Sequence, residues 1–475
     1  MDKKILIKKS SFIIKSKEIQ DNYIIGDMIG KGSTGVIRRL IDKTTNQVRA
    51  VKMIPLKRIN KINLFEKDIE IIRGLDHPNI IKMYEYYQDE KYFYIVMEYC
   101  NGGELLLKVG DLGQITEDMA KTYFIQMISA VNYIHSKGLF LKNLRPEKFM
   151  FNSVSPNSTI KLLNLSFSMI LQTPTLGNLV RLKPLLTTDY FEAPEIFSGK
   201  YDKSCYIWSC GIILYVLLCG TLPFEGISYK ELNQKLIDGN IKLIESDFEG
   251  ISNEAKELIY LMLNAPEKRL TASQILENKW LKSSCEISLN VKLDCSKLVK
   301  QIKAFNTCKR LHKTILTNIA TQCNEAEVAQ ITKTFLAIDT NHDGHLSYEE
   351  ICKAFEGSMT KEELLYLMDS LDVDKSGQID FTEFLASTLD SNIFLSEERL
   401  IKAFNSFDKD KSGKISAQEI KNFISSDCSE NDEKLIEDII NEADLDGDGQ
   451  IDLNEFMKMM NNFNDLERKI ALIQK

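Results

Sequence analysis

The chain lacks a cysteine framework, a long apolar run and an excess of positive charge, and each absence excludes a class of protein. Its ten cysteines are scattered without a Cys-x-x-Cys pair, which argues against a disulfide-rich secreted domain and for reduced thiols. The longest apolar run, residues 212–219, is too short to cross a bilayer. A formal net charge of −8 argues against a general nucleic-acid binder.

Targeting signals are missing as well. No apolar signal-peptide stretch follows Met1, and Asp2 stands where N-myristoylation requires glycine. We therefore expect a cytoplasmic protein without a membrane anchor and without a nucleic-acid partner, while association with the cytoskeleton stays open.

The length of 475 residues predicts about three domains of ~150 residues each. Shifts in composition and pattern divide the chain into an arm, a segment of β-rich stretches followed by helices, a basic junction, two helix–loop–helix pairs and a tail. We place the arm, which we expect to be disordered, at 1–22, and the β-rich then helical segment at 23–281, with the change from strands to helices at about 97/98. The basic junction follows at 282–325, the two helix–loop–helix pairs at 326–390 and 391–465, and the tail at 466–475.

Four twelve-residue loops begin at Asp339, Asp372, Asp408 and Asp444, 33, 36 and 36 residues apart. A calcium loop needs oxygen donors at positions 1, 3 and 5, a backbone carbonyl at 7, a bidentate Glu at 12 and Gly at 6. Four such matches in register form an internal repeat and predict four Ca²⁺ sites. The predicted ligand residues are Asp339, Asn341, Asp343, His345, Glu350; Asp372, Asp374, Ser376, Gln378, Glu383; Asp408, Asp410, Ser412, Lys414, Glu419; and Asp444, Asp446, Asp448, Gln450, Glu455.

The repeat region resembles two calmodulin-like EF-hand lobes, which implies an all-α domain. Position 8 of every loop is apolar, so we expect short strand contacts that pair neighbouring loops; these residues are Leu346, Ile379, Ile415 and Ile451.

A glycine-rich loop, Gly30 to Val36, opens the second segment between two β-type stretches. Glycines there let backbone N–H groups approach phosphates. Further motifs follow in a fixed order: Ala50-Val51-Lys52, His77-Pro78-Asn79-Ile80, the hinge-like stretch 96–100, Ala193-Pro194-Glu195, and Arg269, which is placed to pair with Glu195.

Segment 23–281 therefore resembles a protein kinase domain, and with the four EF-hands the chain resembles the calcium-dependent protein kinase family. The resemblance implies an α+β fold: a bilobal kinase-like domain, with an N-lobe at about 23–97 and a C-lobe at about 98–281, followed by the all-α EF-hand domain. It also implies nucleotide contacts from Ile29, Gly30, Gly32, Gly35, Val36, Lys52, Asp68, Met97, Glu98 and Cys100.

The residues that transfer phosphate in this family have changed. Kinases use HRDxxxxN, in which the Asp accepts the substrate proton and the Asn holds Mg²⁺, and a DFG Asp as the main metal carboxylate. This chain has Asn143, Lys148 and Asn164 at those three positions. An amide has no useful basicity, and a lysine repels the metal. Loss of the base alone costs ~10²–10⁴ in rate, so we expect an inactive or very weak enzyme in which ATP binding stays open and Mg²⁺ binding is doubtful.

Other departures leave the fold intact. Leu141 and Leu165 replace an aromatic His and Phe but remain apolar, so packing survives. Asp68 is one methylene short for the usual ion pair with Lys52, and Tyr206 replaces the Asp that braces the catalytic loop in kinases. Selection for the fold without the reaction explains this pattern.

The junction at 291–313 is basic, and Leu298, Ile302 and Phe305 form one apolar stripe on it. We expect this amphipathic helix to be an intramolecular partner of the Met-rich EF-hand lobes. Three functions remain open: a pseudokinase scaffold whose partner binding is switched by Ca²⁺, an active Ca²⁺-dependent Ser/Thr kinase with a remodelled site, or a calcium-responsive component of a larger, cytoskeletal assembly. Its protein partners cannot be named from the sequence.

Overall fold

The computed structural model describes most of the chain. The described residues are 15–16, 19–32, 35–59, 62–112, 115–139, 144–155, 158–163, 191–198, 202–224, 228, 231–232, 234–235, 243–282, 298–299, 301–302, 305, 310–356, 359–373, 375–390, 396–424, 436–437, 440–441 and 443–461.

The first lobe is a six-stranded sheet with one helix. The strand order is β1-β5-β6-β4-β3-β2, antiparallel throughout except for the parallel pairing of β1 with β5. Apolar residues of β4, β5 and β6 alternate between the two faces, so one face packs on α2 and the other forms a second, tyrosine-rich cluster. The elements are β1 Lys15–Ser16, α1 Ile19–Asn22, β2 Tyr23–Lys31, β3 Val36–Asp42, β4 Val48–Pro55, α2 Ile62–Arg73, β5 Met83–Gln88 and β6 Tyr92–Met97.

The arm expected to be disordered is therefore partly ordered, and the expectation is wrong for the described residues 15–16 and 19–22. Ile19 is buried beside Tyr23 and Tyr87, so an apolar anchor holds the end of the arm on the sheet.

The second lobe is mainly helical, as expected. Helix α5 is apolar on all sides, which is typical of a central buried helix. It packs on α4 and α7, and a Cβ at Gly211 would lie 2.9 Å from Leu263 Cδ2, so glycine permits this close approach. The main elements are α3 Leu105–Leu112, α4 Glu117–Ser136, β7 Phe149–Phe151, β8 Ile160–Leu162, α5 Ser204–Cys219, α7 Asn253–Met262, α8 Ala272–Leu276 and α9 Lys279–Lys282.

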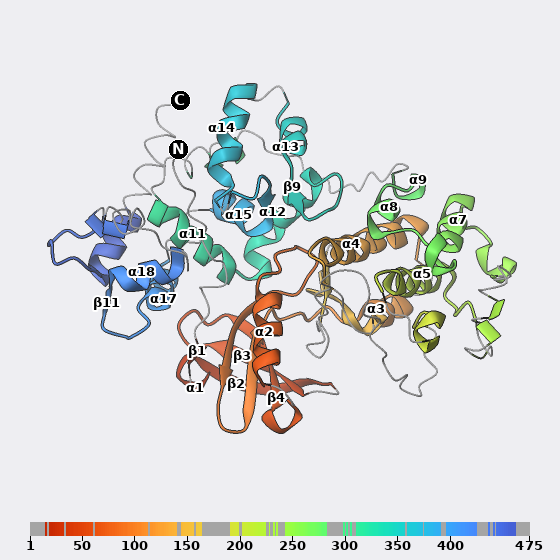
Figure 1. The fold of residues 1–475 in the computed structure, drawn as a ribbon, viewed down its shortest axis with the longest axis horizontal. Coiled ribbons are helices and arrows are strands. Elements are labelled where there is room, and N and C mark those ends of the chain that lie inside the picture. Colours follow the sequence, from red (N-terminus) through yellow and green to blue (C-terminus); the bar gives the residue numbers. More distant parts are fainter. Residues whose placement is uncertain are drawn as a thin grey trace.

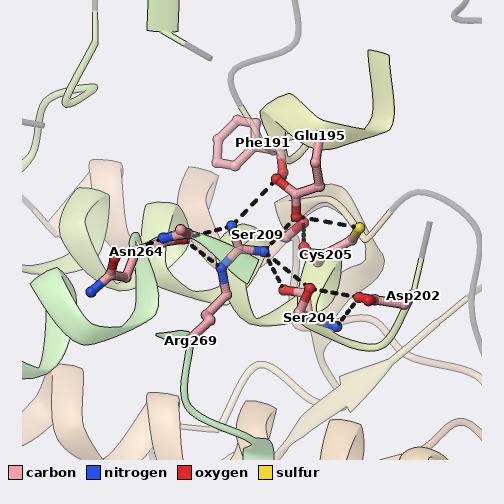
Figure 2. Close-up of polar contacts among 9 residues, drawn as sticks. Phe191, Glu195, Asp202, Ser204, Cys205, Ser209, Asn264 and Arg269 are labelled. Atoms are coloured by element: carbon pink, nitrogen blue, oxygen red, sulfur yellow. Dashed lines mark hydrogen bonds and ion pairs between the residues drawn. The ribbon is translucent and has the colours of Figure 1, made fainter. Parts of the chain in front are cut away.

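The expected pair between Glu195 and Arg269 is confirmed and lies at the centre of a buried polar network (Figure 2). Arg269 Nη1 is 2.6 Å from Glu195 Oε1, with the two side chains 0% and 8% exposed. The guanidinium also donates to the carbonyl oxygens of Ser204 and Asn264. The network ties residues 194–198 to the start of α5, so the frame of a kinase C-lobe is retained.

The EF-hand region contains two similar halves and a long helix that contacts both. Helix α11 packs against α15 of the first half and α17 of the second, and it lies between the two halves in Figure 1. The predicted contacts between position-8 residues are confirmed, since Leu346 pairs with Ile379 and Ile415 with Ile451. The elements are α11 Arg310–Gln322, α12 Glu325–Ile338, β9 His345–Leu346, α13 Tyr348–Ala354, α14 Lys361–Leu371, β10 Ile379–Asp380, α15 Phe381–Thr388, α17 Glu397–Phe407, β11 Lys414–Ile415, α18 Ala417–Ile424 and β12 Ile451–Asp452.

The α+β prediction is thus confirmed: a bilobal domain is followed by a helical domain with paired loops. Among the residues that the structure describes, no helix combines the length and apolarity needed to cross a membrane.

Arg269→Ala should lower the free energy of unfolding of the C-lobe by about 3–5 kcal/mol, because it leaves the buried Glu195 carboxylate without its cation. Urea unfolding followed by tryptophan fluorescence reports on this lobe, since both tryptophans of the chain, Trp208 and Trp280, lie in its core. The control is Lys279→Ala, which breaks an exposed pair with Glu257 and should cost far less than Arg269→Ala, because solvent screens that pair. Equal costs for the two variants would contradict the prediction.

Candidate functional site

The four calcium loops share one backbone conformation. The residue at position 4 has a positive φ in each loop, and so does the glycine at position 6. In each loop the Asp at position 1 accepts a hydrogen bond from that glycine's N–H at 2.8–3.0 Å. Glycine suits a left-handed turn that bends the chain around a central point. The positions with positive φ are His342, Gly344, Lys375, Gly377, Lys411, Gly413, Gly447 and Gly449.

Helix capping places the Glu at position 12. Ser347 and Glu350 form a capping box at the start of α13, and Asp380 and Glu383 form one at α15. The same glutamates reach back across their loops, where Glu350 accepts from Asn341 N at 3.0 Å and Glu383 from Val373 N at 2.9 Å. The exiting helix therefore presents a carboxylate to the loop.

In loops 3 and 4, three predicted carboxylate ligands lie close enough together to share one ion. One carboxylate oxygen from each of Asp408, Asp410 and Glu419 lies within 4.8 Å of the others, and the same holds for Asp444, Asp446 and Glu455. Ser376 and Ser412 at position 5 donate to the carbonyls of Gln378 and Lys414 at position 7. In the first loop, Asp343 N–H donates to Asp339 at 3.1 Å and to Asn341 at 2.8 Å, and His345 N–H donates to Asp343. Asp448 and Gln450 lie together in the fourth loop, whereas the predicted ligand Asp374 lies outside the described residues.

The junction segment packs into the EF-hand core. Ile302 and Phe305 are 0% and 1% exposed within the cluster that fills both halves, and Leu298 packs on it. The predicted apolar stripe is therefore confirmed at its three positions. The cluster also contains the methionines expected to receive it, which are Met359, Met368, Met457, Met459 and Met460.

The EF-hand domain docks on the kinase-like sheet, on the face that carries the tyrosine-rich cluster and lies opposite α2 (Figure 1). Arg49 on β4, 1% exposed, donates to Gln322 O at the end of α11, and Tyr84 OH donates to Cys323 O at 3.3 Å. The Arg49 guanidinium lies 3.6 Å above the Tyr84 ring. A cation at a helix C-terminus satisfies carbonyls that have no partner within the helix.

A second docking contact brings one cation to two buried carboxylates. Lys402 on α17 pairs with Asp42 and lies 3.9 Å from Glu85, which are 2% and 3% exposed. Although burial opposes it, the Lys402 ammonium holds the pKa of Asp42 below its ordinary value, together with the N–H groups of Thr45 and Thr44. Sequence reasoning missed Arg49, Asp42, Glu85 and Lys402, because no motif marks a charge that a distant domain will cover.

The lowered pKa makes docking acid-sensitive. Asp42 contributes stability that is present above the ordinary aspartate value of about 3.9 and is lost as the pH falls through its lowered docked value. In Lys402→Met, only the N–H groups of Thr45 and Thr44 would still oppose the effect of burial on the Asp42 carboxylate, so its pKa should rise and the loss should begin at a higher pH. Small-angle scattering between pH 3 and 7 should show an expanded chain at a higher pH in the variant. Lys235→Met, which breaks an exposed pair with Glu231, should behave as the unchanged chain; the same expansion in it would contradict the prediction.

The residues predicted to contact a nucleotide lie partly within the described residues, around the cleft between the two lobes. A Cβ on Gly35 would lie 2.2 Å from Met53 O, so packing alone requires that glycine. A Cβ on Gly30 or Gly32 would meet nothing closer than 3.8 Å, so packing does not require these two. Ile29 is exposed on β2 and Val36 begins β3, on the two sides of the loop.

Two lysines, the buried Lys52 and the half-buried Lys148, give the cleft positive charge. Burial lowers the pKa of Lys52 on β4 to about 8. Burial and the nearby charges of Arg145 and Lys52 lower the pKa of Lys148 to about 8 as well. Lys148 thus lies close enough to Lys52 to feel its charge, at a position where a kinase holds a metal. Asn143 and Asn164 lie outside the described residues.

The remaining predicted contacts differ in how they can act. Burial raises the pKa of Asp68 on α2, which is opposite to the effect of an ion pair with Lys52. The Glu98 carboxylate is bound within the protein by Lys161 at 3.0 Å and by Lys82 N at 3.2 Å, and the Glu98 N–H donates to Lys82 O at 2.9 Å. Met97 ends β6, and Cys100 is buried three residues later.

Tyr206, at the position of the kinase brace, is 2% exposed and packs edge-on against His135 with ring centroids 5.2 Å apart. A ring contact with α4 therefore lies at the start of α5, where kinases have the bracing Asp. The overall arrangement defines a class of protein: a bilobal kinase fold whose N-lobe sheet carries a docked pair of EF-hand lobes.

Comparisons with known proteins agree with this class. The protein kinase domain family matches residues 23–281, and the EF-hand domain pair matches residues 328–389 and 397–461. Calcium-dependent protein kinase 5 of Plasmodium falciparum is 36% identical over 455 residues, covering 94% of this chain and 79% of that protein. Calcium-dependent protein kinase 9 of Arabidopsis thaliana is 31% identical and covers 98% of this chain and 86% of that protein. The chain belongs to the calcium-dependent protein kinase family.

Proposed function

We propose that this protein is a cytoplasmic calcium sensor in which four EF-hand sites control a catalytically impaired kinase fold. Bound Ca²⁺ supplies the positive charge that compensates the crowded carboxylates of each loop. The EF-hand lobes hold the junction helix and dock on the sheet, so the surface offered to protein partners changes. The output is a change of partner binding instead of phosphate transfer.

One observation supports the impaired chemistry above all. Lys148 is half-buried, and its pKa is lowered by burial and by the charges of Arg145 and Lys52, so the cleft holds a second cation at the position where kinases bind a metal. A site with two lysines and amides at Asn143 and Asn164 does not fit Mg²⁺, which prefers oxygen ligands with negative charge. We therefore derive no step through magnesium.

The test is calcium-stimulated phosphate transfer from ATP to a basic peptide. The unchanged chain is compared with the triple variant Asn143→Asp, Lys148→Asn, Asn164→Asp. We expect the unchanged chain to be silent and the variant to gain activity, because it regains the base and both metal ligands; removal of each group costs ~10²-fold or more. Transfer by the unchanged chain that is lost in Lys52→Met would mean that this is an active kinase with a remodelled site.

We also propose that the cleft binds ATP without magnesium. Gly30 and Gly32 leave room for phosphates to approach the backbone, and Lys52 and Lys148 supply charge that the metal supplies in kinases. The nucleotide then acts as a ligand that stabilises the closed lobes instead of as a substrate.

The pKa values set a pH dependence for this binding. Both lysines are largely protonated at pH 7 and lose their protons as the pH rises through about 8. ATP affinity should therefore fall about tenfold or more between pH 7 and pH 9, and added Mg²⁺ should not raise it. Thermal-shift titration at one fixed calcium concentration measures both effects, with Lys148→Met as the variant whose pH dependence is flatter. The absence of any shift at millimolar ATP would refute nucleotide binding.

A further inference from the structure

A small cavity lies where the end of α11 meets the kinase-like domain. Its volume is about 40 Å³. A cavity for one water needs about 10–15 Å³, so this one has room for about three or four water-sized atoms. We call it the α2–α11 cavity, because α2 ends at Arg73 and α11 at Gln322, and both residues line it. Its lining includes Arg73, Asp76 and Lys82 of the kinase-like domain and Thr321, Gln322 and Thr382 of the EF-hand domain.

Arg73 presents an unused pair of donors to this cavity. Its side chain is only 5% exposed, and Nη1 pairs with Glu70 Oε1 at 2.5 Å. Nε and Nη2 are buried, and neither has a hydrogen-bond partner among the residues that the structure describes. These two N–H groups lie on the same side of the planar guanidinium, so they form a fork that matches two oxygens of one oxyanion. Because a buried charged donor without a partner is costly, the fork indicates a ligand.

The charges around the cavity favour an anion. The Asp76 carboxylate is engaged by Thr382, from which it accepts N–H and Oγ1–H hydrogen bonds at 2.9 and 2.8 Å. Lys82 Nζ donates to the same hydroxyl at 3.3 Å. A further cation lies near, since burial and the charge of Arg73 lower the pKa of Lys409. The two cations of the lining therefore stand against one carboxylate that already has partners.

The two helix ends at the cavity do not repel an anion strongly. Carbonyl oxygens at a helix C-terminus carry partial negative charge. At the end of α2, the oxygens of Ile71 and Ile72 accept from Gly74 N and Leu75 N at 3.0 and 3.1 Å. At the end of α11, Gln322 O accepts from Arg49. Donors thus compensate these carbonyls on the side away from the fork.

The side chain of Gln322 selects among anions. Its Oε1 is buried, and within the described part of the chain no donor reaches it. Hydrogen phosphate has acceptor oxygens for Arg73 and an O–H group for Gln322, so it satisfies both. Sulfate has acceptor oxygens alone, so it would leave Gln322 Oε1 facing another acceptor.

We propose that the α2–α11 cavity binds hydrogen phosphate, which accepts from Nε and Nη2 of Arg73 and donates to Gln322 Oε1. This site is separate from the nucleotide cleft that contains Lys52 and Lys148. Residues of both domains line the cavity, so bound phosphate favours the docked arrangement, because a ligand stabilises the state that binds it. Free phosphate therefore acts on docking from a site of its own.

The test is a thermal-shift titration of the full chain with sodium phosphate, at fixed pH, ionic strength and calcium concentration, with sodium sulfate for comparison. Phosphate should raise the melting temperature at lower concentrations than sulfate does. Arg73→Lys keeps the charge but removes the fork, so phosphate binding should weaken at least about tenfold. Gln322→Met removes the unpaired acceptor, so the preference for phosphate over sulfate should disappear.

Two control variants should leave phosphate binding unchanged. Arg39→Lys makes the same substitution at an exposed arginine of β3, and Lys148→Met removes a charge from the cleft. If Lys148→Met abolishes the shift while Arg73→Lys keeps it, phosphate binds in the cleft and the proposal is wrong. Equal shifts with sulfate and phosphate in the unchanged chain would also overturn it.

A second measurement needs no variant. Crystals of the unchanged chain soaked in sodium arsenate, which carries the same O–H group as phosphate, should show an anomalous peak beside Nε and Nη2 of Arg73. Peaks found solely at other places would refute the site even if Arg73→Lys failed to fold.

Discussion

The buried cation of Arg49 is the interaction on which the assembled molecule depends. Its guanidinium stacks on Tyr84 and donates to Gln322 O at the C-terminal end of α11. Helix α11 in turn packs on both EF-hand halves, so this contact, together with those of Lys402 and Asp76, holds the regulatory domain on the kinase fold. A charge buried in this way is stable only while its partners remain in place. Docking is therefore favourable only in the complete arrangement.

The docking interface and the altered cleft both bring charged side chains together, but with different signs. On the tyrosine-rich face of the sheet, Lys402 compensates Asp42 and Glu85, so charges meet across the interface. In the cleft, the charge of Lys52 acts on Lys148, so like charges lie near each other. The Glu195–Arg269 network and Tyr206 are buried in the C-lobe. The positive charge of the cleft is the basis of the proposed binding of a phosphate without its metal.

The first EF-hand pair contacts the kinase fold at Asp76 and Ser129. The contacts come from Thr382 at the start of α15 and from His342 O in loop 1. The first pair therefore touches both lobes. The second pair contacts the kinase fold through Lys402 on α17, the helix before loop 3. Loop 4 is exposed to solvent.

The sequence by itself determined the local features, because turn geometry and periodicity act over a few residues. The calcium loops, the position-8 contacts, the apolar stripe of the junction and the Glu195–Arg269 pair were all readable from spacing. The anchoring of Ile19 could not be read from spacing, because it depends on the tyrosine-rich face of the folded sheet. Only the tertiary structure decided which charges are buried together: Arg49 with the end of α11, Lys402 with Asp42, and loop 1 with His77. These contacts join residues hundreds of positions apart, and burial by a distant domain leaves no local pattern.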